Sequence, residues 1–308
     1  MLYRIKDRYF YSREGFNIVR CENCGLIYLN PQPDLVELKK HYSRVYFPRL
    51  NQDKMNEKSD DRFDIKCRNR LNEVLSFSKS GKVLDIGCSD GYFLNYLKQK
   101  GWQVEGVEIS EFASQKTRER YNINIFCGEL PQAGYPDEYF DVVSLFEVLE
   151  HLPDPAGTLQ EVRRILKKNG LLIMTVPNFD SLQRLLFGKY WHIIDPPRHL
   201  FYFSKTTLNS ILVKCNFNKC IIEVIDGAEV LGINKTRGYS ESWRTIFKKP
   251  LILTEVGARQ DVSSLRTREE SIFIKNFLHH FEVAVFMVPY VIAKLFSRED
   301  TLLIKAIK

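Results

Sequence analysis

Polar residues and glycines that could bind a ligand or take part in a reaction follow two successive apolar segments near the middle of the chain. In VLDIGCSDGYF, residues 83–93, an apolar run ends at Asp85, and Gly87 and Gly91 follow it. Because glycine has no Cβ, its backbone can approach a ligand closely after a buried strand. Glu108 ends the next apolar run. A carboxylate there can accept hydrogen bonds from both hydroxyls of a ribose, although Glu108 could equally cap the following helix.

The spacing of the two glycines narrows the class of ligand. A dinucleotide-binding turn has the pattern G-x-G-x-x-G, and a P-loop ends in Gly-Lys-Ser/Thr. This turn has the pattern D-x-G-x-x-x-G and lacks both signatures. The pattern therefore favours a nucleoside without a phosphate chain and argues against an NAD-dependent dehydrogenase.

A third apolar segment, 140–146, runs into the polar stretch EVLEH. If this segment is a parallel neighbour of the first two, Glu147, Glu150 and His151 lie at the same edge of the sheet. Two carboxylates and an imidazole beside a nucleoside site could take part in proton transfer.

The composition sets the class of protein. With 308 residues, 44% of them hydrophobic, the chain can form one large domain or a smaller domain with additions. The net charge of +7 favours a contact with an anionic partner, or reflects a lysine-rich soluble surface.

The seven cysteines are scattered, as in a reducing compartment. The charged N-terminus lacks a signal-peptide core, and the longest apolar run, 283–293, is interrupted by Pro289. We expect a cytoplasmic protein, with peripheral membrane contact left open.

The order of apolar and helical patterns predicts an α/β fold. From residue 82, short apolar segments alternate with helical segments, which is typical of a parallel sheet built from βαβ units. We expect strands at 82–87, 102–110, 122–128, 140–147, 171–178, 219–226 and 301–308, and helices at 34–42, 63–79, 91–101, 111–121, 154–170 and 204–217. Three parts are predicted: a hairpin and linker, 1–62; a main domain, 63–226 plus 301–308; and a helical insertion, 227–300, which is too long for a plain loop.

The segments VLDIGCSDG, GVEIS, FDVVSLFEVLEHLPDP and GLLIMTVPN, in this order and spacing, resemble the class I S-adenosylmethionine-dependent methyltransferases. The resemblance covers about 82–226 and the last strand. It implies a doubly wound, Rossmann-like sheet of seven strands, whose last strand is antiparallel and lies between the fifth and the sixth. It also implies S-adenosylmethionine as the cofactor.

The same resemblance assigns a set of residues to the cofactor site. They are Asp85, Gly87, Cys88 and Gly91 at the methionine and ribose end, Glu108 on the ribose hydroxyls, Ile109 and Glu129 at the adenine, and Phe146 and Glu147 beside the sulfonium. Ser89 stands where the family often has glycine, and we interpret it as a variant that still binds.

A second segment, YWHIIDPPRHLFYFS at 190–204, resembles a branch of this family with sugar- and polysaccharide-modifying members and small-molecule O-methyltransferases. Methyl transfer requires an in-line arrangement, and a hydroxyl acceptor benefits from a general base. His199 is the first candidate for the base and His151 the second, with a structural role as the alternative for each. Trp191 and Arg198 are candidate substrate-binding residues, although Arg198 could equally form a salt bridge. We predict O-methylation of a small molecule or a sugar or polysaccharide precursor.

Cys21 and Cys24 in VRCENCGLIYLNPQP, 19–33, offer half of a tetrahedral zinc site. Many members of this branch carry a zinc module whose second half looks like this stretch. The first half would precede residue 5, where this sequence has no cysteine. Either the start of the sequence is truncated or the site has degenerated, and in both cases we expect no bound metal and a hairpin whose LIYL strand packs on the domain.

Other functions and partners remain open. The apolar part of the insertion could cover the pocket, form a homodimer interface or lie on a membrane. The basic flanks are compatible with an RNA or protein methyltransferase, but no RNA-binding module is recognisable and no nucleic-acid partner is expected. FEVL also stands where N-methylating enzymes of planar acceptors have an Asn-Pro-Pro-Tyr-like motif. A non-catalytic subunit that binds S-adenosylmethionine is disfavoured because Asp85, the glycines and Glu108 are present.

Overall fold

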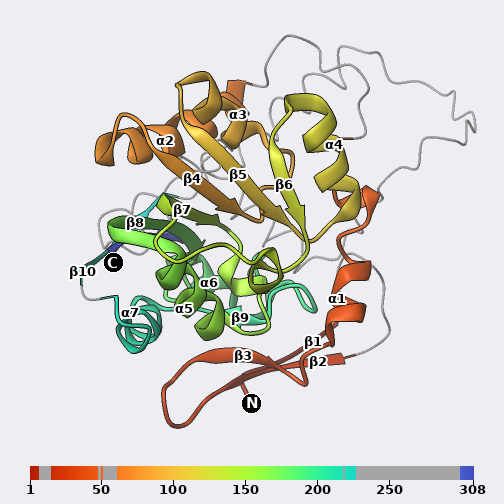
Figure 1. Ribbon diagram of the computed structural model, residues 1–308. Helices are drawn as coiled ribbons and strands as arrows, with labels where there is room; N and C mark the ends of the chain where they lie inside the picture. The colour runs from red at the N-terminus through yellow and green to blue at the C-terminus, as the bar shows by residue number, and fades with distance from the viewer. Residues whose placement is uncertain (7–14, 48–49, 51–60, 218, 227–298) are drawn as a thin grey trace, which may run out of the picture.

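The computed structural model describes residues 1–6, 15–47, 50, 61–217, 219–226 and 299–308. These residues form a large sheet of seven strands and a small sheet of four (Figure 1). The helices pack against the large sheet, and the small sheet lies below it in the view of Figure 1.

The large sheet has the strand order β10-β11-β8-β7-β4-β5-β6. Its strands are β4 (Lys82–Ile86), β5 (Gln103–Glu108), β6 (Asn124–Cys127), β7 (Phe140–Phe146), β8 (Leu166–Pro177), β10 (Lys219–Ile225) and β11 (Thr301–Ile307). β11 runs antiparallel to both of its neighbours, β8 and β10, whereas β8, β7, β4, β5 and β6 pair in parallel. The predicted doubly wound sheet with an antiparallel last strand between the fifth and sixth is confirmed.

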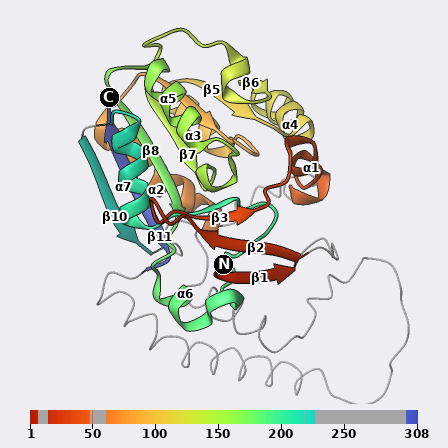
Figure 2. The same ribbon diagram turned by 90° about the horizontal axis from the view of Figure 1, so that it is seen from below.

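Helices cover both faces of the large sheet, which explains why its central strands are continuous apolar runs. Successive side chains of a strand point to opposite faces, so Val142 packs in the cluster with helices α2 and α3, and Val143 in the cluster with α5 and α7. The helices are α2 (Asp61–Phe77), α3 (Tyr92–Gln99), α4 (Glu111–Tyr121), α5 (Pro155–Ile165) and α7 (Lys205–Lys214). Figure 2 shows α5 and α7 along the same side of the sheet.

Helices α5 and α7 begin where the sequence supplies a capping side chain. The Asp154 carboxylate accepts a hydrogen bond from Gly157 N at 2.9 Å, and Pro155 occupies the first turn of α5. Ser204 and Thr207 form a capping box at the start of α7. Such caps stabilise a helix by about 1 kcal/mol each, because they satisfy backbone N–H groups that have no partner within the helix.

One predicted boundary is wrong. The sequence pattern extends the helix that begins at Asp154 to a C-cap at Gly170, but α5 ends at Ile165 and β8 begins at Leu166. Leu166 is extended, fully buried and paired with Phe140. Burial of this leucine in the sheet therefore overrides the helical tendency of the lysines that follow it.

The small sheet joins the N-terminus to the segment before α7. Its strands, all antiparallel in the order β1-β2-β3-β9, are β1 (Tyr3–Lys6), β2 (Gly15–Arg20), β3 (Ile27–Asn30) and β9 (Phe201–Tyr202). The predicted hairpin is β2–β3, and its LIYL strand packs on the domain as expected: Ile27 and Leu29 are buried, and Leu29 N donates to Leu200 O at 2.8 Å. β1 and β9 were not predicted.

Several short helices complete the described chain: α1 (Leu35–Lys40), capped by Asp34, η1 (Arg44–Tyr46), η2 (Leu130–Ala133), η3 (Leu149–His151), α6 (Leu182–Phe187) and η4 (Gly188–Tyr190). None of the helices in the described ranges combines the length and apolar composition that a bilayer-spanning helix needs. The predicted helical insertion lies outside the described residues except for its last two positions, so the three-part division of the chain stays a prediction.

Candidate active site

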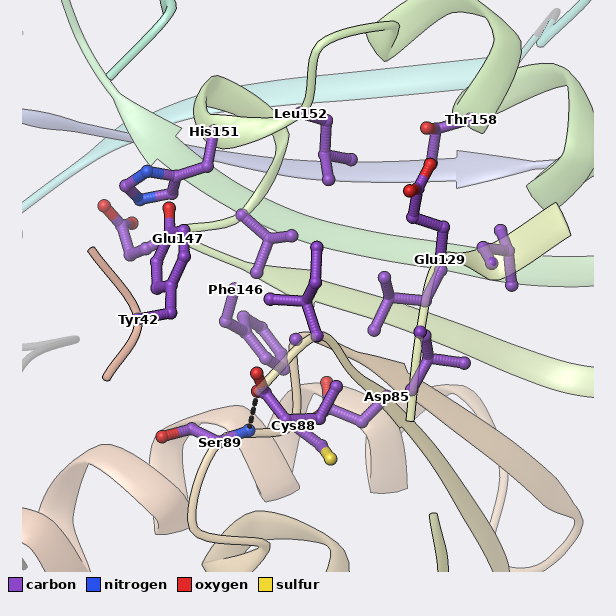
Figure 3. Close-up of a pocket in the computed structure, with 18 of the residues that line it drawn as sticks. Tyr42, Asp85, Cys88, Ser89, Glu129, Phe146, Glu147, His151, Leu152 and Thr158 are labelled. Atoms are coloured by element: carbon purple, nitrogen blue, oxygen red, sulfur yellow. Dashed lines mark hydrogen bonds between the residues drawn. The ribbon is translucent and has the colours of Figure 1, made fainter. Parts of the chain in front are cut away.

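A cavity of about 1000 Å³ opens at the carboxyl ends of β4, β5 and β7 (Figure 3). In an open α/β sheet this edge is where ligands bind, because the loops that follow the strands diverge there. Asp85 and Ser89 lie on one side of the cavity in Figure 3, and Tyr42, Glu147 and His151 lie together at another.

The turn after β4 has the geometry that its glycines predict. Gly87 and Gly91 have φ values of +70° and +67°. A Cβ on Gly87 would meet Val148 Cγ2 at 2.5 Å, and one on Gly91 would meet Thr117 Cγ2 at 2.2 Å. Both positions therefore exclude a side chain on conformational and on packing grounds. Gly87 lines the cavity, whereas Gly91 supports the turn from behind.

Ser89 adopts the left-handed conformation that glycine normally provides, with φ +51°. Its backbone N–H donates to Glu108 Oε2 at 2.9 Å, drawn as the dashed line in Figure 3. This bond fixes the turn after β4 to the end of β5. A non-glycine residue in this region carries a conformational cost of about 1–2 kcal/mol, which the bond to Glu108 offsets in part.

Glu108 ends β5 and is only 5% exposed. Its carboxylate accepts hydrogen bonds from Ser89 N and, at 2.9 Å, from Ser110 N. Burial raises the pKa of Glu108, and these backbone hydrogen bonds oppose that shift. Since an ionised carboxylate offers about four acceptor positions, two remain for a ligand in the cavity.

The other residues predicted for the cofactor site also line the cavity: Asp85, Cys88, Ile109, Glu129, Phe146 and Glu147. Asp85 accepts a hydrogen bond from Ser144 Oγ at 2.7 Å, which orients its carboxylate across the sheet. Glu147 has a left-handed φ of +58° directly after β7. A strained residue between a strand and a cavity is a feature of functional sites.

Sequence reasoning missed Arg70, a cavity-lining residue of α2. Its guanidinium carbon lies 4.1 Å from the centre of the Phe146 ring, and Nε and Nη2 are buried without a hydrogen-bond partner in the described part of the chain. Burial lowers the pKa of Arg70, while Asp85 and Glu147 act in the opposite direction. A buried cation with unused donors is suited to an anionic ligand group. The sequence shows a helix at 63–79 but gives no signal for which arginine faces inward.

The N-terminal segment lines the cavity with apolar and aromatic side chains. They are Leu35, Leu38, Tyr42, Tyr46, Phe47 and Leu50. Ser110 Oγ donates to Tyr42 O at 3.0 Å, so this segment is tied to the end of β5. Burial raises the pKa of Tyr42, which keeps its hydroxyl protonated. The part of the cavity lined by this segment is therefore mainly apolar.

Of the two candidate bases, His151 lines the cavity and His199 does not. His151 Nδ1 donates to the carbonyl oxygen of Arg198 at 2.9 Å, and this leaves the lone pair on Nε2. Burial lowers the pKa of His151 to about 4. The His199 ring lies edge-on to it at 4.6 Å between centroids, and burial, followed by the nearby His151, lowers the pKa of His199.

The two predicted substrate-binding residues lie outside the cavity lining. Trp191 is fully buried in an apolar cluster beneath the small sheet, where it meets the Phe179 ring at 6.2 Å. Arg198 is 7% exposed, forms an ion pair with Asp195 and lies 5.4 Å from the centre of the Tyr46 ring. These contacts favour the salt-bridge alternative for Arg198 and a packing role for Trp191.

Cys21 and Cys24 lie on the turn between β2 and β3, away from the cavity lining. Hydrogen bonding from the backbone of Cys24 lowers the pKa of Cys21. Cys67, the nearest other thiol in the sequence, is buried in the cluster formed by α2 and α3.

A family model described as a methyltransferase domain matches residues 60–221, more than half of the chain. The chain belongs to this methyltransferase domain family. The match spans the whole cofactor side of the cavity, from Arg70 to the end of β8. It ends within β10, so most of the small sheet lies outside it.

Two curated relatives of this methyltransferase domain illustrate the similarity. A "Probable S-adenosylmethionine-dependent methyltransferase" of Mycobacterium tuberculosis is 32% identical over 136 residues, which cover 44% of this chain and 48% of the relative. A "Ubiquinone biosynthesis O-methyltransferase" of Thiobacillus denitrificans is 32% identical over 112 residues, or 34% and 48% of the two chains. This chain therefore spans about half the length of the curated relatives it matches.

The fold also recurs in solved structures. A crystal structure from Galdieria sulphuraria superimposes with a TM-score of 0.50 at 16% identity, covering 88% of this chain and 98% of the other. At this identity the similarity shows the methyltransferase fold alone.

Proposed function

We propose that this protein is an S-adenosylmethionine-dependent methyltransferase that methylates a hydroxyl group of a small molecule. One observation carries the proposal. A single cavity contains both a nucleoside-type site, formed by the Gly87 turn and Glu108, and His151 with its Nε2 lone pair. The "O-methyltransferase" in the name of the Thiobacillus relative supports the choice of oxygen as the acceptor atom.

The described residues fit the cofactor at both of its ends. Glu108 has two acceptor positions left for the ribose hydroxyls after its bonds to Ser89 N and Ser110 N. At the amino-acid end, the unused donors of Arg70 match a carboxylate, and Asp85 supplies a negative charge for an ammonium group. When bound, S-adenosylmethionine supplies an electrophilic methyl group on a sulfonium.

The chain's own contribution to catalysis is to orient the reactants, exclude water and accept a proton. The aromatic segment around Tyr42 and Phe47 covers the cavity and favours a flat, apolar acceptor over a sugar. His151 Nε2 accepts the proton of the acceptor hydroxyl, while the Arg198 carbonyl holds the ring through Nδ1–H. His199 packs against this ring and positions it.

Separate measurements of binding and turnover test the proposal. Isothermal titration calorimetry with S-adenosylhomocysteine should show one site per chain, and a labelled-methyl assay with phenolic and sugar acceptors should find transfer to a phenolic hydroxyl. Saturable NAD binding without S-adenosylhomocysteine binding would overturn the assignment. Methyl transfer to sugars alone would support the methyltransferase activity but contradict the proposed preference for a flat, apolar acceptor.

A further inference from the structure

Three potential metal ligands meet beside the cavity, from two segments that lie far apart in the sequence. Glu150 and His151 belong to η3, and His199 lies in the loop before β9. Two hydrogen bonds join the segments: Leu200 N donates to Glu150 O at 2.8 Å, and His151 Nδ1 donates to Arg198 O at 2.9 Å. The small sheet reinforces this junction because β3 pairs with β9.

The polar atoms of this cluster are not satisfied by the residues that the structure describes. Glu150 is 1% exposed, and among those residues neither of its carboxylate oxygens finds a hydrogen-bond partner. The buried Nδ1 atom of His199 likewise has no partner within the described ranges. A buried carboxylate without a donor or a counter-charge costs several kcal/mol, so it must be protonated or must hold a cation.

The cluster has the ligand types and spacing that a divalent cation needs. One ligand atom from each of Glu150, His151 and His199 lies within 4.8 Å of the others, and Glu150 Oε1 is 3.9 Å from His151 Nε2. Metal–ligand bonds of about 2.1 Å place neighbouring ligand atoms roughly 3–3.5 Å apart. Small side-chain movements would therefore bring all three atoms onto one ion.

The second nitrogen of His151 is held in the manner of a metal ligand, because His151 Nδ1–H donates to the Arg198 carbonyl and leaves Nε2 for an ion. Metal-binding histidines almost always donate their other ring N–H to a carbonyl or carboxylate, which fixes the tautomer and directs the free lone pair.

We infer that Glu150, His151 and His199 bind a divalent transition-metal ion at the wall of the cavity. Two imidazole nitrogens and one carboxylate oxygen suit Mn²⁺, Fe²⁺, Co²⁺ or Zn²⁺ better than Ca²⁺ or Mg²⁺. Among the described residues this is the one group of three such side chains within metal-binding distance, and the Cys21–Cys24 turn is not part of it.

The inference rests on the proposed function and specifies how the acceptor hydroxyl is activated. Three protein ligands leave positions for an acceptor oxygen on the cavity side of the ion, and a metal-bound hydroxyl loses its proton more readily. The proton passes to the Glu147 carboxylate, which lines the cavity. The oxygen then bonds to the methyl carbon as the carbon–sulfur bond breaks, and the sulfur keeps the electron pair. With the ion bound, His151 Nε2 is a ligand and no longer the base.

Cobalt titration tests the site independently of methyl transfer. Metal-stripped full-length protein carrying Cys21→Ser and Cys24→Ser is titrated with Co²⁺ and followed by visible absorption, so that thiolate ligation cannot contribute. We expect one Co²⁺ per chain with ligand-field bands of nitrogen and oxygen ligation. Glu150→Gln and His199→Asn should each weaken Co²⁺ binding at least about 10-fold. His192→Ala, a neighbouring histidine outside the cluster, is the matched control.

S-adenosylhomocysteine affinity and thermal unfolding, measured on every variant, separate a lost metal site from a lost fold. Lack of Co²⁺ binding by the folded starting protein, or binding unchanged in both cluster variants, would overturn the inference and leave Glu150 as a protonated acid. Lost metal binding with unchanged nucleoside affinity supports the inference. Failure to bind S-adenosylhomocysteine would refute the proposed function, whereas the Co²⁺ titration would still decide whether the metal site exists.

Discussion

The cofactor side and the acceptor side of the cavity are built in different ways. The nucleoside part of the cofactor side, the turn after β4 and Glu108, comes from one continuous stretch, β4–α3–β5, whose two ends are joined by the Ser89 hydrogen bond. The acceptor side is assembled from the segment around Tyr42, the η3 turn and the loop that carries His199. A local unit encodes the nucleoside part of the site, whereas acceptor recognition depends on contacts between distant segments that can change independently. Each variant below alters one side of the cavity, and the measurements on it report whether the other side is affected.

The largest effect is expected from His151→Ala, which alters only the acceptor side. As base or as metal ligand, His151 acts on the acceptor hydroxyl, so turnover should fall by about 10²–10⁴-fold. S-adenosylhomocysteine affinity should stay within about 2-fold, because Glu108 and Arg70 are untouched. Steady-state kinetics and calorimetry on the same preparation check both expectations. A large loss of nucleoside affinity would show that the two sides are not separable.

Glu108→Ala should weaken nucleoside binding on the cofactor side of the cavity. It removes the acceptors proposed for the ribose and leaves the N–H groups of Ser89 and Ser110 without partners. We expect a loss of S-adenosylhomocysteine affinity of about 100-fold, or roughly 3 kcal/mol. Glu111→Gln, at an exposed position of α4, is the control. Equal affinity of the two variants in calorimetry would contradict the role of Glu108.

Arg70→Gln should weaken only the contact with the amino-acid end of the cofactor. S-adenosylhomocysteine has a carboxylate there and methylthioadenosine does not, so the variant should lose about 10-fold in affinity for the first ligand and almost nothing for the second. Arg68→Gln, on the exposed side of α2, provides the comparison. If both ligands weaken alike, Arg70 acts through the fold and not through a carboxylate.

The smallest effect is expected from Ser89→Gly. Glycine removes the cost of the left-handed backbone at φ +51° but adds flexibility to the unfolded chain. The free energy of unfolding should therefore rise by no more than about 1 kcal/mol, and nucleoside binding should persist. Urea unfolding measures this change. A clear destabilisation would mean that the serine side chain makes a contribution beyond its backbone.

The contrast between the cofactor side and the acceptor side also explains which parts of the fold and the site could be predicted from the sequence. The strands of the large sheet were predicted from hydrophobic periodicity and are confirmed, whereas β1 and β9 of the small sheet were not predicted. The glycine turn and Glu108 were recognised from spacing within about 30 residues, and Gly87 and Glu108 both line the cavity. Trp191 and Arg198 do not line the cavity. Trp191 is buried beneath the small sheet, and Arg198 forms an ion pair with Asp195.

Arg70 and the place of Tyr42 at the cavity were missed for the same physical reason. The inward face of α2 is decided by packing against Phe146, and the position of Tyr42 by its hydrogen bond from Ser110. Both contacts join residues far apart in the chain, and local patterns carry no signal for them.

Calorimetric titration of the purified protein with S-adenosylhomocysteine tests the central claim most directly. The account predicts one site per chain with micromolar or tighter affinity, weakened about 100-fold by Glu108→Ala and retained by His151→Ala. Absence of binding by the folded protein, or an affinity that Glu108→Ala leaves unchanged, would contradict it.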